Sequence, residues 1–194
     1  MADGKSRPDR RADLLAAART TLAEKGLEAT TVSEIVARAG VAQGTFYLYF
    51  PSKMAIVTAL TQEMNEHILA AVRTATLSST SATEVVQAGV SATFQQIARY
   101  KDILSIIHSP VASFPSLQEW EEQFGPYRRL VSELIQHWQA AGEIVASVNP
   151  EITARLIIGL INHAADDCYI YNAQGDPALY MAEVIRFISR ALGL

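Results

Sequence analysis

Cysteine is almost absent from this sequence, since Cys168 is the only one among 194 residues. A single cysteine excludes a disulfide within the chain and is typical of a protein that works in a reducing cytoplasm. Long apolar runs are missing too, because no stretch reaches the roughly eighteen residues that a membrane span needs. The start of the chain, Met1 to Arg11, is polar and basic, unlike a signal peptide. We therefore expect a cytoplasmic protein that does not enter a membrane.

Signatures of catalysis and of β-structure are also missing. The sequence contains no nucleophile–base pair, no phosphate-binding loop and no zinc motif. It has no alternating run of β-branched residues between hairpin turns. These absences predict an all-α protein that is not an enzyme and that needs neither a cofactor nor a metal.

Helix start and stop signals recur along the chain and predict about nine helices. A long helix is expected from Ser52 or Lys53 to about residue 74, and a Ser/Thr-rich loop follows at 77–81. Ser81 and Glu84 have the spacing of a capping box, and a capping side chain precedes a proline at Asn149 and at Asp176. Further helices are expected at 82–100, 102–108, 117–141 (with a kink at Gly125-Pro126), 150–172 and 177–192.

The strongest pattern lies in residues 31–56, TVSEIVARAGVAQGTFYLYFPSKMAI. Thr31 and Glu34 form a capping-box pair, and Gly40 stands where the end of a helix favours a left-handed residue. A second helix is expected from Gln43 to Phe50. Two helices joined by so short a turn form a helix-turn-helix, whose second helix fits the DNA major groove. Geometry alone leaves open a helix-turn-helix that only packs within an all-α protein.

The second helix of this motif carries side chains suited to DNA. Phe46 and Phe50 are spaced to anchor it to a core, and Gln43 can pair with the edge of an adenine. Tyr47 offers a hydroxyl to phosphate, and Lys53 lies beside the N-terminus of the next helix, which also attracts phosphate. The predicted DNA-binding residues are Thr31, Ser33, Gln43, Gly44, Thr45, Tyr47, Tyr49 and Lys53.

The net charge of −4 is unevenly distributed along the chain. Residues 1–60 hold eight basic and six acidic residues, a charge of +2, whereas residues 61–194 hold eight basic and fourteen acidic residues, a charge of −6. This asymmetry is expected of a DNA-binding end joined to a body that does not bind DNA. The N-terminal basic residues have two possible roles. They can contact phosphates or the minor groove, or they can form a solvated tail; these residues are Lys5, Arg7, Arg10 and Arg11.

Residues 10–56 resemble the N-terminal domain of the tetracycline-repressor (TetR) family of bacterial transcription regulators. The similarity lies in the leading helix LLAAARTTLAEKG, in TTVSEIVARAGVAQGTFYLYFPSK and in the spacing between them. The chain departs from the family at Leu22 and Leu27, where aromatic residues are usual, and at Ala42, where a serine often caps the second helix. The resemblance implies a DNA-binding domain at 1–56 and a ligand-binding and dimerisation domain at 57–194.

The last two expected helices are apolar on more than one side. Ile152, Leu156 and Leu160 form one stripe of the first helix, beside a second stripe that includes Ile161, and the other helix carries a stripe that includes Phe187. A helix with two apolar stripes needs two partners. A second copy of the chain in a four-helix bundle, which the family resemblance implies, and a buried hairpin within one chain both satisfy this need.

Aromatic and polar side chains between residues 82 and 171 suit an apolar cavity with a few polar anchors, although an aromatic residue at helical spacing more often belongs to plain core. The resemblance implies that a small-molecule effector binds there. The candidate ligand-binding residues are Phe94, Ile97, His108, Phe124, Tyr127, Trp138, Asn162, His163 and Asp166.

His163, Asp166 and Asp167 have spacings that place an imidazole and two carboxylates on one helix face. A metal site normally takes further ligands from another element, so a polar interface or a ligand anchor is favoured over a metal. Two functional classes follow. The first, which is favoured, is a dimeric transcription repressor released from a palindromic operator by a small apolar or amphipathic ligand, and an activator is a third possibility that the sequence does not exclude. The second is a small all-α enzyme or metal-binding protein that uses this face.

Overall fold

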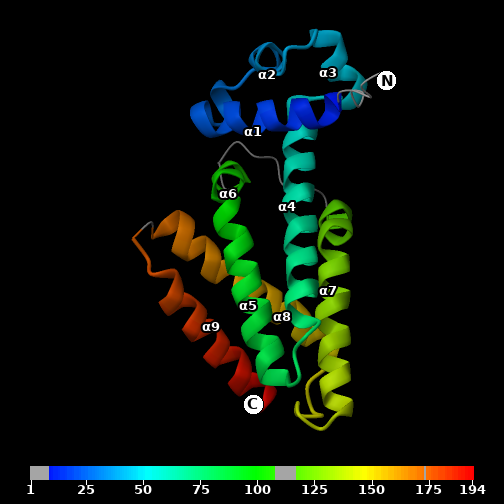
Figure 1. The fold of residues 1–194 in the computed structure, drawn as a ribbon, viewed down its shortest axis with the longest axis vertical. Coiled ribbons are helices and arrows are strands. Elements are labelled where there is room, and N and C mark those ends of the chain that lie inside the picture. Colours follow the sequence, from blue (N-terminus) through cyan, green and yellow to red (C-terminus); the bar gives the residue numbers. More distant parts are fainter. Residues whose placement is uncertain (1–8, 108–116, 173) are drawn as a thin grey trace, which may run out of the picture. The chain divides into compact units, whose positions relative to one another are not determined.

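A computed structural model of the chain describes residues 9–107, 117–172 and 174–194 (Figure 1). Within these ranges it contains nine α-helices, one short π-helix and no strand, so the all-α prediction is confirmed. No helix in the described ranges is long and apolar enough to cross a membrane. The α-helices are α1 (Arg10–Ala29), α2 (Val32–Ala39), α3 (Gln43–Tyr49), α4 (Lys53–Thr76), α5 (Ala82–Arg99), α6 (Lys101–Ile107), α7 (Leu117–Ala140), α8 (Pro150–Asp166) and α9 (Pro177–Leu192).

The chain folds as two compact units. The first contains the residues up to Glu63 and a segment beginning at Ser105, and the second contains Met64–Leu104 and the C-terminal part of the chain. The division falls inside α4, which is one continuous helix. The boundary expected after residue 56 lies in the same helix.

The first unit is built by α1, α2, α3 and the start of α4. Its core consists of side chains that these helices bury almost completely, with Leu14 and Leu22 from α1, Ile35 from α2, Phe46 from α3 and Ile56 from α4. Such complete burial in so short a chain segment is the main source of its stability, because each large aliphatic or aromatic side chain contributes about 1.5–3 kcal/mol.

The ends of α2 are capped as the sequence predicts. The Thr31 hydroxyl accepts the Glu34 backbone N–H at 3.3 Å, and the Glu34 carboxylate accepts the Thr31 backbone N–H at 2.9 Å. Gly40 takes a left-handed conformation with φ of 66° and ends the helix. These two signals confirm the predicted bounds of the first helix of the motif.

The second unit packs α5 against α9, α7 against α8, and α8 against both α5 and α9 (Figure 1). Val90, Phe94 and Leu192 are almost completely buried in it. The predicted caps are confirmed, since Asn149 Oδ1 accepts the Ile152 N–H at 3.0 Å and Asp176 Oδ1 accepts the Ala178 N–H at 2.9 Å.

Two local details differ from expectation. The single helix expected over 150–172 is α8 followed by a π-helix (Asp167–Tyr171), in which the Asn172 N–H donates to the Asp167 carbonyl at 2.7 Å. The expected capping box at Ser81 is only half formed, because Glu84 Oε2 accepts the backbone N–H and the hydroxyl of Thr80 instead. The predicted end of the 102–108 helix at His108 lies outside the described residues.

The pKa of Glu34 makes the stability of the first unit sensitive to acid. Hydrogen bonds from Lys25 (2.6 Å), then from the Thr31 backbone and hydroxyl, lower the pKa of Glu34 from about 4.5 to about 2. Because the folded pKa lies below the unfolded one, this stabilisation is complete above about pH 4.5 and is lost as the pH falls through 2.

We therefore predict that Glu34→Gln, which keeps the capping-box hydrogen bond but removes the charge, lowers stability at pH 6 and loses this effect towards pH 2. Urea unfolding of the whole protein at several pH values measures the difference. Glu28→Gln in the same unit is the control, because it removes an equal charge from an exposed side chain. A destabilisation by Glu34→Gln that stays constant between pH 6 and pH 2 would contradict the prediction.

Candidate functional site

Helix α3 presents an exposed face above a buried anchor. Phe46 is 0% exposed and Phe50, just after the helix, is 3% exposed, so these two rings attach α3 to the core. On the outer side Tyr47 is 53% exposed and Leu48 is 82% exposed. Gln43 is also exposed. A seven-residue helix is not stable alone, so the two phenylalanines are what keep this outer face in place.

The turn between α2 and α3 fixes where α3 begins. The Val41 N–H donates to the Val36 carbonyl at 3.1 Å after the left-handed Gly40, which closes the end of α2. Ala42 then stands at the N-cap of α3 without a side-chain hydrogen bond, as the sequence predicts. The Thr45 N–H donates to the Ala42 carbonyl at 2.9 Å.

The predicted DNA-binding residues differ in their exposure to solvent and in the hydrogen bonds that they already make. Ser33, Gln43, Gly44 and Tyr49 are exposed, and Thr45 is half-buried. The Thr31 hydroxyl is already engaged, because it accepts the Glu34 N–H and donates to the Glu34 carboxylate at 3.0 Å.

Lys53 has partners within its own unit. Its Nζ donates to the carbonyl of Leu27 at 2.6 Å and to that of Thr30 at 2.7 Å. These carbonyls lie between a break in α1 at Gly26, where φ is 75°, and the start of α2. Lys53 therefore joins the first turn of α4 to the connection between α1 and α2, a role that its position in the sequence did not reveal. An ammonium has three N–H donors, so one remains for a phosphate.

The basic residues of the first unit are largely paired within it. Lys25 contacts Glu34, Arg38 forms a salt bridge with Glu24, and the Arg11 guanidinium lies 5.7 Å from the centre of the Phe50 ring. Helix α3 itself has no basic residue. Its outer face consequently offers DNA hydrogen-bonding and apolar groups rather than positive charge. Lys5 and Arg7 lie outside the described residues.

Leu48 lies on this face but is not among the predicted DNA-binding residues. An exposed leucine on a helix that enters the major groove can contact the methyl group of thymine. Its exposure is predictable from the sequence, because a residue two positions from both Phe46 and Phe50 lies on the opposite side of the helix.

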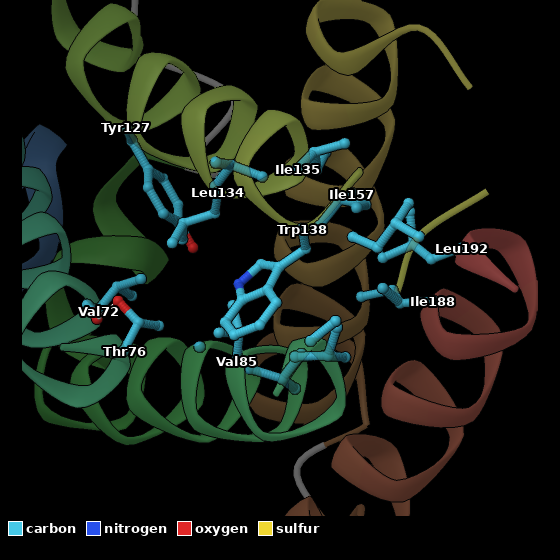
Figure 2. Close-up of a pocket in the computed structure, with 16 residues that line it drawn as sticks. Val72, Thr76, Val85, Tyr127, Leu134, Ile135, Trp138, Ile157, Ile188 and Leu192 are labelled. Carbon is cyan, nitrogen blue, oxygen red and sulfur yellow. Dashed lines mark hydrogen bonds between the residues drawn. The ribbon is translucent and has the colours of Figure 1, made fainter. Parts of the chain in front are cut away.

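The second unit contains a cavity of about 60 Å³ (Figure 2). Its wall comes from α4, α5, α7, α8 and α9 and is made mainly of aliphatic side chains. The members with polar side-chain atoms are Thr76, Tyr127 and Trp138. No Lys, Arg, His, Asp or Glu belongs to the wall formed by the described residues.

Of the predicted ligand-binding residues, Tyr127 and Trp138 line this cavity. Phe94 and Ile97 are buried in the same unit but do not contribute to the cavity wall. His108 lies outside the described residues. Four further candidates also lie away from the wall, and they are the half-buried Phe124, Asn162 and Asp166 and the exposed His163.

The polar groups of the wall are mostly satisfied. The Thr93 hydroxyl donates to the Gly89 carbonyl at 2.8 Å, so its bond with the Tyr127 hydroxyl at 2.9 Å uses the hydrogen of Tyr127. Burial raises the pKa of Tyr127 to about 12, which keeps the phenol neutral. The Thr76 hydroxyl donates to the Val72 carbonyl at 2.9 Å. In contrast, the buried indole Nε1 of Trp138 has no hydrogen-bond partner among the described residues.

The His163, Asp166 and Asp167 face lacks the geometry of a metal centre. His163 is exposed, and the Asp167 carboxylate accepts a hydrogen bond from the Tyr180 hydroxyl at 2.6 Å. In the described part of the chain, no group of three or more His, Cys, Asp or Glu side chains is placed to hold a metal ion.

Two family descriptions match this chain. Residues 14–60 match the bacterial regulatory proteins of the tetR family, and residues 86–192 match the tetracyclin repressor-like C-terminal domain. The first match covers α2 and α3 with their exposed face, and the second covers the helices that supply most of the cavity wall.

Individual relatives agree with these matches. The HTH-type transcriptional regulator YvdT of Bacillus subtilis is 33% identical over 181 residues, which cover 93% of each chain. The HTH-type transcriptional repressor KstR2 of Rhodococcus jostii is 26% identical over 141 residues, 73% of this chain and 67% of that repressor. The transcriptional regulator FadR from Bacillus subtilis, solved in complex with stearoyl-CoA, shares the fold with a TM-score of 0.78 at 23% identity, over 91% of this chain and 96% of FadR.

The contacts of Lys53 predict a structural effect of its removal. Lys53→Met keeps the aliphatic stem but leaves two partly buried carbonyls without their donor, so we expect a loss of about 1–3 kcal/mol in the free energy of unfolding. Chemical denaturation of the whole protein measures this loss. Lys25→Met is the control, since its salt bridge with Glu34 is more exposed and should contribute below about 1 kcal/mol. Equal small losses for both variants would show that Lys53 does not join α4 to the α1–α2 connection.

Proposed function

This chain belongs to the TetR family of bacterial regulatory proteins, and from that premise we propose that it represses transcription at a roughly palindromic operator from which a small apolar or amphipathic ligand releases it. It is a DNA-binding transcription regulator and not an enzyme, as its family and relatives indicate. The alternative of an enzyme or metal-binding protein built on His163, Asp166 and Asp167 has no support from the family or from the surroundings of those residues.

The observation that carries the DNA proposal is the exposed face of α3 above Phe46 and Phe50. We place α3 in the major groove, with Gln43 reading an adenine and Leu48 contacting a thymine methyl group. Tyr47 and the remaining N–H of Lys53 then contact phosphates. Because its target is chromosomal DNA, we propose that the protein acts in the cytoplasm.

We propose a homodimer because α8 and α9 of a single chain expose large apolar side chains to solvent. Ile152 and Leu156 are 59% and 67% exposed on α8, and Leu179 and Phe187 are 61% and 65% exposed on α9. Other side chains of the same helices are buried, such as Ile158 on α8 and Ile188 on α9. Each helix therefore has one face for its own core and another for a partner. Pairing of these faces across a two-fold axis matches a palindromic operator, because both half-sites then meet the same residues.

The ligand proposal depends on the cavity in the second unit. Its wall is apolar, and the stearoyl-CoA bound by the similarly folded FadR carries an apolar chain, which supports an apolar effector for this chain. Helix α4 supplies Val72 and Thr76 to the wall, and Lys53 lies at its other end. A ligand that favours one conformation of α4 changes operator affinity by its differential binding to the two conformations, and by no more. Similarity to KstR2, which is a transcriptional repressor, supports repression.

The DNA proposal is tested by selecting a binding site from random duplexes and measuring affinities on it. Gln43→Ala should cost about 1–3 kcal/mol on the selected site and much less on random DNA, because it removes a base contact. Replacing thymidine by deoxyuridine removes the methyl group. This replacement should weaken DNA binding by the wild type more than it weakens DNA binding by Leu48→Ala. Leu77→Ala is the control, since Leu77 is 78% exposed but belongs to the second unit. A Gln43→Ala loss of equal size on random DNA would make Gln43 a backbone contact.

The homodimer is tested by placing charge on the exposed faces of α8 and α9. Leu156→Glu and Phe187→Glu should each convert the dimer into a folded monomer, because burying an unpaired carboxylate in an apolar interface is costly. Sedimentation gives the mass, and circular dichroism checks the helical fold. Leu77→Glu adds the same charge to an exposed leucine of the same unit and should stay dimeric. If both helix variants also stay dimeric, the interface lies elsewhere.

A further inference from the structure

Trp138 gives the cavity of the second unit a specific chemical preference. Building on the proposed function, we propose that the cavity selects uncharged, mainly apolar molecules that carry a hydrogen-bond acceptor, and that Trp138 Nε1 donates to that acceptor. Suitable acceptors are ketone, ester, ether and hydroxyl oxygens. Figure 2 shows the indole nitrogen of Trp138 directed into the space that Thr76 and Tyr127 also face.

The hydrogen bonds of the wall leave Trp138 as its free donor. An indole N–H can only donate, and Trp138 Nε1 is buried without a partner among the described residues. The Tyr127 hydrogen is used by Thr93, and the Thr76 hydrogen is used by the Val72 carbonyl. A buried donor without an acceptor costs free energy, which a ligand acceptor recovers when it binds. The indole therefore favours a ligand with an oxygen over a hydrocarbon of the same shape.

The charge of the wall excludes an ionised ligand. The described residues that line the cavity include no cationic side chain. A carboxylate or phosphate placed there would lose its hydration without gaining an opposite charge, which is the costliest kind of burial. The part of the effector that enters this cavity is therefore neutral.

Gly89 offers a way to close the cavity. It lies on the wall, and a Cβ built on it would be 4.0 Å from Thr76 Cγ2 and 4.0 Å from Val72 Cγ1, which is ordinary van der Waals contact. The two further methyl groups of valine then occupy the cavity itself, whose volume is about 60 Å³. Gly89→Val should therefore block ligands. Gln87→Val is its control, because it places the same β-branched residue at an exposed position of α5.

The experiment uses three probes of nearly equal size with the full-length protein. Acetone has the acceptor, 2-methylpropene replaces its carbonyl oxygen by CH₂, and acetate carries a charge, and each has only four heavy atoms, in keeping with a cavity of about 60 Å³. Binding is followed by the nitrogen-15 resonance of the Trp138 indole. This resonance is assigned as the one that disappears from the spectrum of Trp138→Phe. We expect the ketone to shift this resonance and to bind about five- to tenfold tighter than the alkene. Acetate should bind at least about tenfold more weakly than the ketone.

The variants separate Trp138 from the rest of the cavity. Trp138→Phe should reduce the ratio of ketone to alkene affinity to below about twofold, since the donor that creates the ratio is gone. Gly89→Val should abolish binding of ketone and alkene, while Gln87→Val should bind both as the wild type does. The comparison of the three probes on the wild type stands even if Trp138→Phe does not fold, because Trp120→Phe removes the other tryptophan and assigns the Trp138 resonance by elimination.

Several results would overturn the proposal. They are equal affinities for ketone and alkene in the wild type, an unmoved Trp138 resonance, a ketone preference that persists in Trp138→Phe, and no binding of any probe. Operator affinity measured on the same samples tests the proposed function separately. If the probes bind as predicted but operator affinity does not change with ligand, the chemistry of the cavity holds and release of DNA by ligand does not.

Discussion

The burial of Phe46 and Phe50 is the interaction on which the DNA-binding surface depends. A seven-residue helix without a side-chain cap has little stability of its own, so α3 exists because these rings occupy the core of the first unit. Their i, i+4 spacing also decides which residues face outward, because one turn separates them on a single face. Exposure of Leu48, on the opposite side of the helix, follows from that geometry, whereas Gln43 is exposed in the first turn of α3. The chemistry offered to DNA is therefore a consequence of how the helix is anchored.

Local signals made much of this fold predictable. The capping box of Thr31 and Glu34 and the proline-associated caps at Asn149 and Asp176 involve residues within three positions of each other, so the sequence alone reveals them. The bounds of α9 were predicted correctly for the same reason. Contacts between distant residues were not predictable. Lys53 reaches carbonyls more than twenty positions earlier in the chain, and no local pattern shows this.

The candidate effector site shows the same division between local and distant information. Composition predicted an apolar cavity with aromatic members, and Tyr127 and Trp138 line the cavity that the fold creates. Composition did not distinguish them from Phe94, whose burial in the core is equally typical of an aromatic residue. Which groups of the wall remain unsatisfied depends on pairings such as Thr93 with Tyr127, which lie 34 positions apart. The preference for a neutral acceptor follows from that hydrogen-bond pattern.

The outward apolar face of α8 and α9 also links the folding of the protein to its abundance. Ile152, Leu156, Leu179 and Phe187 lie in water on a single chain, so any surface that covers them adds its binding free energy to that of folding. Apparent stability then rises with concentration. In the proposed homodimer, a subunit diluted below the dissociation constant of the dimer spends longer as the less stable monomer. The copy number of such a regulator thereby sets part of its own lifetime.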